Sequence, residues 1–335
     1  MDTFISEQSL PVLIILFLAS LAALSKATDF LIDHAVVLSK KFGISEMIIG
    51  ATIVSLGTTL PELAISISAV LQESTDLALG NAVGSVITNT ALVLGVGSLA
   101  GSVPVLRNTS GRLLFLVSAI FILVFGSIRS WGGDFFYSDG HLPRLIGFLF
   151  LCAIPLYLSS PFWTSEKKIR RHESKEGAPI RKKDLLMEGS LILSSGAVVA
   201  FSAAVLISTV STLAARLGVS KAIIAGTVIA FGTSLPELST TFTSARKGYG
   251  GLAMGNVLGA SILNILLVLG VSISVSPGGL TVPALFYRVH FPIALSVVGI
   301  LTYFIFNTRK MEISNREGLV LLAIYLFYLF FNLVA

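Results

Sequence analysis

The chain has 335 residues, of which 54% are hydrophobic and only 12% are charged, and its mean hydropathy is +0.89. Soluble domains carry about 25% charged residues, so this composition excludes an ordinary water-soluble domain. The net charge of +5 does not indicate nucleic-acid binding, because the basic residues lie in loops between apolar runs. The single cysteine, Cys152, excludes an internal disulfide framework and a cysteine-based metal site.

Long apolar runs follow one another along the whole chain. A helix that crosses a bilayer needs roughly 20 apolar residues, and these runs are too long and continuous for barrel strands. We therefore predict an all-α polytopic membrane protein with ten transmembrane helices. The first run, from Leu10, is predicted to be a span and not the core of a cleaved signal peptide. The expected limits are 9–38, 44–72, 77–100, 112–128, 142–162, 185–215, 219–245, 250–275, 284–307 and 317–334.

The longest connection, residues 164–184, divides the chain near its middle. It is rich in lysine and arginine, and a charged run of this kind is typically a solvated linker. Lysine and arginine accumulate on the cytoplasmic side of membrane proteins. The charge pattern therefore predicts a multi-pass protein of the plasma (inner) membrane, with the linker in the cytoplasm and both the N- and C-termini outside.

Two motifs occur twice at one offset. GTTLPELAIS begins at Gly57 and GTSLPELSTT at Gly232, so 175 residues separate the two copies. The same offset aligns Gly80–Val96 with Gly255–Val271 at ten of seventeen positions. Each half is expected to hold five spans, and an odd number makes the second half enter the membrane from the opposite side. The sequence thus predicts two inverted five-helix repeats, 1–163 and 185–335, within a single transporter domain, 1–335. Repeats of this kind build transporters whose substrate site lies near the midplane.

Each copy of the first motif gathers oxygen atoms. At helical spacing, Thr58, Thr59 and Glu62 approach one face. Pro61 has no N–H group, so the carbonyl of Gly57 loses its helical partner. The second copy supplies Thr233, Ser234, Pro236 and Glu237. The next span of each half adds Ser85 and Asn89 in the first half and Asn264 in the second, where Ala260 occupies the position of Ser85.

A cluster made only of oxygen ligands suits hard cations such as Ca²⁺, and the lack of paired His or Cys disfavours zinc or copper. Glu62 and Glu237 have no cationic neighbour within either motif, and a buried charge in a membrane needs a partner. Their combined charge of −2 would be neutralised by one Ca²⁺, by two monovalent ions or by two protons, which is a physical basis for exchange. In the alternative interpretation, the prolines only kink helices and the polar groups only bond neighbouring helices.

Further residues receive structural interpretations. Asp29 and Asp33 are expected to pair with Lys26 at helical spacing in the first span, or to approach the cytoplasmic surface. The glycine pairs Gly80 and Gly84, and Gly255 and Gly259, are expected to allow close helix packing.

The paired motifs GTTLPE with GNAVGSVITN and GTSLPE with GNVLGASILN resemble the two α-repeats of the calcium/cation antiporter superfamily, especially its prokaryotic sodium/calcium exchanger-like proteins. The resemblance implies that Glu62 and Glu237 are the principal cation ligands and that the first and sixth spans move to alternate access. It also implies further ligands: Thr58, Thr59, Thr233 and Ser234 through hydroxyl or backbone oxygens, Ser85, Asn89 and Asn264, and the carbonyls of Ser55 and Ala230.

Taken together, these features predict a secondary antiporter, not an enzyme, that exchanges Ca²⁺ for Na⁺ by alternating access. The expected partners are Ca²⁺, a monovalent counter-ion and the lipid bilayer, with no cofactor, nucleic acid or obligatory protein partner. Some sodium/calcium exchangers have an aspartate at the position of Asn264, and Ala260 lacks a hydroxyl, so the counter-ion stays open. The alternatives are a proton-coupled antiporter of Ca²⁺ or another divalent cation and, less favoured, a passive cation channel.

Overall fold

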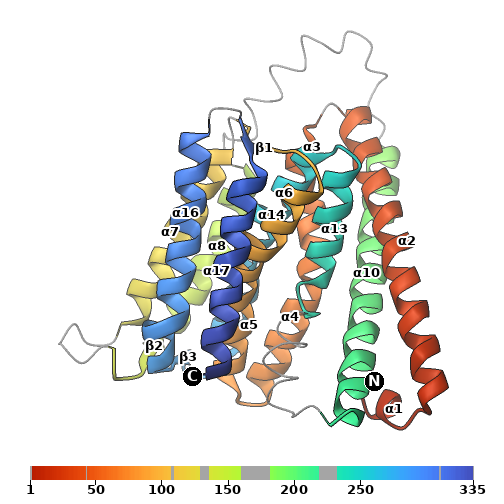
Figure 1. Ribbon diagram of the computed structural model, residues 1–335. Coiled ribbons are helices and arrows are strands. Elements are labelled where there is room, and N and C mark those ends of the chain that lie inside the picture. Colours follow the sequence, from red (N-terminus) through yellow and green to blue (C-terminus); the bar gives the residue numbers. More distant parts are fainter. Residues whose placement is uncertain are drawn as a thin grey trace.

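The computed structural model describes residues 2–42, 44–106, 109–128, 136–159, 182–218, 232–308 and 311–334. Figure 1 shows a bundle of roughly parallel helices with both chain ends at the same end of the bundle. Seven helical segments of the described residues are long and apolar enough to span a membrane, and α8 is a shorter apolar helix. The expected spans agree with the helices to within a few residues wherever the chain is described.

The first half begins with α1 (Asp2–Ser6) and the long α2 (Leu10–Phe42). The next span contains α3 (Glu46–Ile49), the π-helix η1 (Gly50–Val54) and α4 (Ser55–Leu71), and the third contains α5 (Thr75–Ile87), η2 (Thr88–Val93) and α6 (Leu94–Ala100). Strand β1 (Val103–Pro104), α7 (Thr109–Ser127), β2 (Gly140–Leu142) and α8 (Arg144–Ser159) complete this half. Two of its spans therefore contain a π-helical turn.

The second half follows the same order. It consists of α10 (Lys182–Arg216), α13 (Leu235–Arg246), α14 (Gly250–Leu263), η5 (Asn264–Leu269), α15 (Gly270–Val275), β3 (Leu280–Val282), η6 (Phe286–His290), α16 (Phe291–Asn307), β4 (Glu312–Ile313) and α17 (Asn315–Val334). Most of the predicted linker 164–184 and the start of the seventh predicted span lie outside the described residues. Each of the ten expected spans contains a helix within the described residues, so the molecule is an all-α membrane protein of ten transmembrane helices in two inverted repeats.

Two short antiparallel ladders join the halves. Strand β1 pairs with β4 and β2 pairs with β3, so each ladder takes one strand from each half. Figure 1 shows the two ladders at opposite ends of the bundle. We use these ladders to name the ends: the β1 end and the β2 end.

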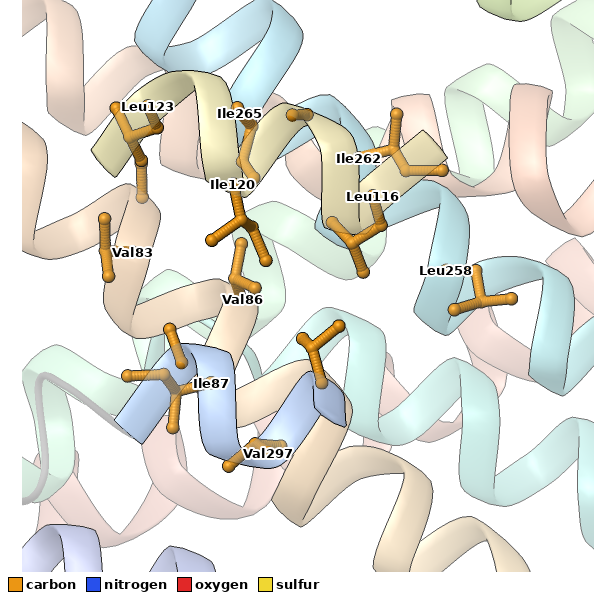
Figure 2. Close-up of a cluster of buried hydrophobic side chains, with 14 of the residues drawn as sticks. Val83, Val86, Ile87, Leu116, Ile120, Leu123, Leu258, Ile262, Ile265 and Val297 are labelled. Carbon is orange, nitrogen blue, oxygen red and sulfur yellow. The ribbon is translucent and has the colours of Figure 1, made fainter. Parts of the chain in front are cut away.

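The apolar side chains form two separate clusters. The larger one fills the space between α5, α7, α14 and α16, and Figure 2 shows side chains from these helices, including Val86, Ile120 and Ile262, pointing toward one another. The smaller one lies mainly between α2 and α10, which pack along each other and stand at one side of the bundle in Figure 1. The α2–α10 pair therefore has an apolar core of its own.

Glycines bring the central helices close together in the second half. A Cβ atom at Gly255 would lie 2.3 Å from the carbonyl oxygen of Met47, and one at Gly259 would lie 2.6 Å from the Cα atom of Ala51. The expected close packing is confirmed for this pair. For Gly80 and Gly84 it is wrong, because an added Cβ would make only ordinary contacts of 3.8 and 3.7 Å with side-chain atoms.

Candidate cation site

The first half of the site lies on α4. Thr58, Thr59 and Glu62 are each 0% exposed, as their common face predicts. Pro61 lies inside this helix, which continues to Leu71. Neither carboxylate oxygen of Glu62 has a hydrogen-bond partner, and neither does the hydroxyl of Thr59. Buried polar atoms without a hydrogen-bond partner are costly unless a further partner binds.

The second half of the site lies at the start of α13. Glu237 is 0% exposed and Ser234 1% exposed, and Thr233 is also buried. Here the backbone differs from the first copy, because α13 begins at Leu235 with Ser234 as its N-cap residue. Pro236 thus lies in the first turn, where its missing N–H group costs no helical hydrogen bond. The two copies of the motif therefore differ in backbone geometry before Leu235.

The fold brings the two copies together. Glu62 and Glu237 are near enough to interact electrostatically, and the hydroxyls of Thr58 and Thr59 lie beside the carboxylate of Glu237. Both carboxylate oxygens of Glu237 are nevertheless without a hydrogen bond of normal geometry. Among the described residues, neither glutamate has an ion-pair partner.

Two asparagines approach from the neighbouring spans. Asn89 lies in η2, which packs against α13, and Asn264 begins η5, which packs against α4. Both are 0% exposed, and neither amide has a hydrogen-bond partner. π-Helical turns occur often at functional sites, where they change the direction in which side chains point. Each asparagine therefore lies beside the glutamate-bearing helix of the other repeat.

The remaining predicted ligands divide into three cases. Ser85 is buried and its hydroxyl has no partner, while its counterpart Ala260 is equally buried and apolar. Ser55 begins α4, and its carbonyl oxygen accepts a hydrogen bond of 3.3 Å from the hydroxyl of Thr58. Ala230 lies outside the described residues.

The donor set is one of oxygen and amide groups. Among the described residues, no group of three or more His, Cys, Asp or Glu side chains could hold a metal ion. The site instead combines two carboxylates with hydroxyls and amide oxygens. This composition suits a hard cation that also accepts neutral oxygen ligands, and it lacks the soft ligands of a zinc or copper site.

Two asparagines next to the site had no role assigned from the sequence. The amide nitrogen of Asn81 donates to the carbonyl oxygen of Glu62, and that of Asn256 donates to the carbonyl oxygen of Glu237. The signal that could have found them is the Gly-Asn pair that occurs in both copies of the second motif.

The expected pairing of Asp29 and Asp33 with Lys26 is wrong. Both carboxylates instead lie 3.0 Å from the Nζ atom of Lys247, which follows α13. Partial burial alone would lower the pKa of Lys247, but the hydrogen bonds to the two aspartates outweigh it and raise the pKa above its ordinary value. The pair joins α2 to α13 at the β1 end, beside a crevice of about 430 Å³ that Asp29 and Lys247 help to line.

Polar groups also join the long helix α2 to α10 and to α13. The Nδ1 atom of His34 lies 2.8 Å from a carboxylate oxygen of Glu188, and the hydroxyls of Thr28 and Ser239 lie 2.9 Å apart between α2 and α13. Sequence spacing could not have found these contacts, because each joins residues more than 150 positions apart.

The molecule consists of inverted five-helix repeats, and the two repeats bury a pair of glutamates where they meet. This arrangement is that of a transporter and not of an enzyme. A family model described as sodium/calcium exchanger protein matches residues 12–163 and 189–334. The chain belongs to this family of membrane cation exchangers.

Curated relatives and solved structures agree with the family. The chain is 30% identical to the sodium/calcium exchanger MaX1 of Methanosarcina acetivorans, over 94% of this chain and 97% of that protein. It is 35% identical to the inner membrane protein YrbG of Escherichia coli over 78% and 80%, and 31% identical to the putative antiporter CaxA of Alkalimonas amylolytica over 94% and 96%. The structure of the sodium-calcium exchanger NCX_Mj superposes with a TM-score of 0.77 at 25% identity, covering 95% of this chain and 98% of that one.

Proposed function

We propose that the protein is a secondary antiporter that exchanges Ca²⁺ for Na⁺ by alternating access around the candidate cation site. The observation that carries the proposal is the pair of buried carboxylates, Glu62 and Glu237, whose oxygens have no hydrogen bond of normal geometry among the described residues. Two carboxylates held together away from water repel each other and require neutralisation. One Ca²⁺ or two Na⁺ ions supply the same charge, so one species can leave when the other replaces it.

The proposed ligands are the side chains and backbone oxygens that surround these carboxylates. Glu62 and Glu237 bind the cation directly, and the other groups complete its shell: Thr58, Thr59, Thr233, Ser234, Ser85, Asn89 and Asn264, with the carbonyls of Ser55 and Ala230. The burial of those that are described and the unpartnered atoms of Thr59, Ser85, Ser234, Asn89 and Asn264 support this set.

We also propose the orientation in the plasma membrane. Lysines at the β1 end, including Lys41 and Lys247, support a cytoplasmic location for that end, since positive residues accumulate there. The basic linker 164–184 then lies in the cytoplasm between the two repeats, 1–163 and 185–335, and both termini lie outside. The relative YrbG, named an inner membrane protein, supports the bacterial-type plasma membrane.

The experiment uses purified protein in sealed vesicles and follows the uptake of radioactive calcium. One batch is loaded with Na⁺, and a second has only an outward-directed proton gradient. Uptake that requires internal Na⁺ is the expected result. Uptake driven by the proton gradient alone would show that the counter-ion is H⁺ and not Na⁺. This is the main alternative, because Asn264 has an amide and Ala260 a methyl group at positions where a carboxylate and a hydroxyl would favour Na⁺. Calcium flux with neither gradient would contradict exchange and favour a channel.

The site itself is tested by Glu62→Gln and Glu237→Gln. Each substitution removes one of the two negative charges that balance the bound cation. Because a charge in a membrane interior costs several kcal/mol without its partner, we expect Ca²⁺ uptake to fall by at least about 100-fold. Glu73→Gln is the matched control, because Glu73 lies on an exposed turn. This variant should exchange Ca²⁺ like the unmodified protein. Normal exchange in both site variants would contradict the assignment.

A further inference from the structure

Asn81 and Asn256 occupy equivalent positions in the two repeats, outside the proposed ligand set. In α5, the Nδ2 atom of Asn81 donates to the carbonyl oxygen of Glu62 at 3.1 Å and to the hydroxyl of Ser66 at 2.9 Å. One amide group therefore holds the backbone of a glutamate and the side chain one turn further along α4.

The second repeat has the same arrangement. In α14, the Nδ2 atom of Asn256 donates to the carbonyl oxygen of Glu237 at 3.4 Å and to the hydroxyl of Thr241 at 3.1 Å. The offset of 175 residues relates the asparagines, the glutamates and the hydroxyl residues alike. Glu62 and Ser66 lie within α4, and Glu237 and Thr241 lie within α13, so the asparagine bonds the same two helical positions in both repeats.

The bond acts on the backbone and leaves the carboxylates available. An amide donor bonded to the carboxylate of Glu62 or Glu237 would compete with a cation for the same oxygens. Donation to the carbonyl oxygen of the same residue fixes where its Cα atom lies without such competition. Because Ca²⁺ is bound at roughly 2.3–2.6 Å from its oxygens, small shifts of either Cα atom change which cation the two carboxylates fit.

Within the described part of the chain, Asn256 has one contact that Asn81 lacks. Its Oδ1 atom lies 3.4 Å from the hydroxyl oxygen of Thr58 in the first repeat, whose single proton is shared between Asn256 and the carbonyl oxygen of Ser55. Asn256 is 0% exposed. This side chain thus bonds the backbone of one glutamate-bearing segment and a hydroxyl of the other, so it connects the two halves of the site directly.

We propose that Asn81 and Asn256 are positioning residues that set the spacing of the two glutamates and thereby the size of the cation that the site selects. The proposal rests on the proposed function, in that the selected cation is the transported one. It assigns the larger role to Asn256, because of these two asparagines Asn256 alone contacts both repeats within the described residues.

The experiment measures binding apart from transport. The melting temperature of the purified protein in detergent is recorded against increasing CaCl₂, SrCl₂ and BaCl₂, for the unmodified chain and for Asn81→Ala and Asn256→Ala. Losing two hydrogen bonds amounts to roughly a tenfold change in affinity. We expect the half-saturating Ca²⁺ concentration to rise about tenfold in Asn81→Ala and further in Asn256→Ala. Ba²⁺ binding should change less, so the preference for Ca²⁺ over Ba²⁺ should fall.

The matched control is Asn307→Ala. Asn307 also donates its amide to a backbone carbonyl, that of Tyr303, but on the exposed end of α16, so its removal should leave the cation preference unchanged. Where Asn256→Ala does not fold, Thr241→Val removes the shared hydroxyl partner and should give a smaller shift in the same direction.

The outcomes separate this proposal from the proposed function. A lower melting temperature without cation, but the same ratio of Ca²⁺ to Ba²⁺ affinity, would show a merely structural role and overturn the positioning proposal. Unchanged variants alongside an unmodified protein that binds and exchanges Ca²⁺ would overturn it while leaving the antiporter intact. An unmodified protein that no cation stabilises would overturn both.

Discussion

The two copies of the GTxLPE motif have nearly the same sequence but different backbones. The first lies within α4, with Pro61 in the helix interior, and the second begins α13, with Pro236 in its first turn. A proline in a helix interior removes a hydrogen bond and crowds the preceding turn, whereas one in the first turn does neither. The comparison shows that the local sequence specifies the ligands, while the surrounding helices decide the backbone that carries them.

The helices that follow the two motifs, α5 and α14, also differ, in how deeply they are buried. Every residue of α14 is buried, whereas α5 exposes Asp76 and Leu77 and leaves others only partly buried. Gly255 and Gly259 contact the backbone of η1 and its neighbours, but Gly80 and Gly84 contact only the ends of side chains. The helix that follows the second motif is therefore the more deeply buried of the two.

The largest expected effect tests this difference in packing. Gly259→Ala places a methyl group 2.6 Å from the Cα atom of Ala51, and overpacking of this kind typically costs about 1–3 kcal/mol. Gly84→Ala, at the equivalent position, meets the hydroxyl of Tyr328 at an ordinary 3.7 Å. We expect a clear fall in the melting temperature for Gly259→Ala and none for Gly84→Ala. Equal effects would show that the two repeats are packed alike.

An intermediate effect is expected from the hydroxyl of Ser85, which Ala260 lacks at the equivalent position of the second repeat. Ser85→Ala removes an unpartnered buried hydroxyl from the site, and the loss of one polar contact of about 0.5–1.5 kcal/mol should raise the half-maximal Na⁺ concentration for Ca²⁺ uptake by roughly two- to tenfold. Ala260→Ser adds the missing hydroxyl and should shift this concentration in the opposite direction. If neither variant changes the Na⁺ dependence, the hydroxyl at this position is not a sodium ligand.

The smallest effect is expected from the ion pairs of Lys247, which have no counterpart among the described residues of the first repeat. The equivalent residue, Gln72, is uncharged and bonds Ser68 of its own helix and the adjoining backbone. Exposed ion pairs contribute about 0.2–1 kcal/mol, so Lys247→Gln should change the exchange rate no more than about fivefold. Lys26→Gln is the control, because Lys26 has no ion pair among the described residues. A larger change in the control would contradict a role for the Lys247 pairs.

The stabilisation that the ion pairs of Lys247 provide also depends on pH in a known direction. The pKa of Lys247 is raised in the folded protein, so its stabilising contribution is complete below the ordinary pKa of lysine, 10.5, and is lost only as the pH rises through the raised value. The exchange rate of Lys247→Gln divided by that of the unmodified protein should therefore stay constant across the neutral pH range. A ratio that varies there would identify a different titrating group.

The sequence predicted what depends on composition, periodicity and repetition. The apolar runs located the helices, and the common offset of 175 residues identified Glu62 and Glu237, which the structure places next to each other. It could not predict contacts that only the three-dimensional arrangement decides. Lys247 meets Asp29 and Asp33 across more than 200 positions, although Lys26 lies nearer along the chain. Asn81 and Asn256 act on backbone carbonyls, which no side-chain pattern reveals.

The two ladders that join the halves have a consequence for biosynthesis. Strands β1 and β2 both belong to the first half, and the partners of both, β4 and β3, belong to the second. While the ribosome is still producing the second half, neither strand of the first has its partner, and unpaired strand edges can bond other chains. We therefore expect the first repeat to be inserted in the membrane in an unfinished form. The final tertiary structure should form only after β4, near the end of translation, has been made.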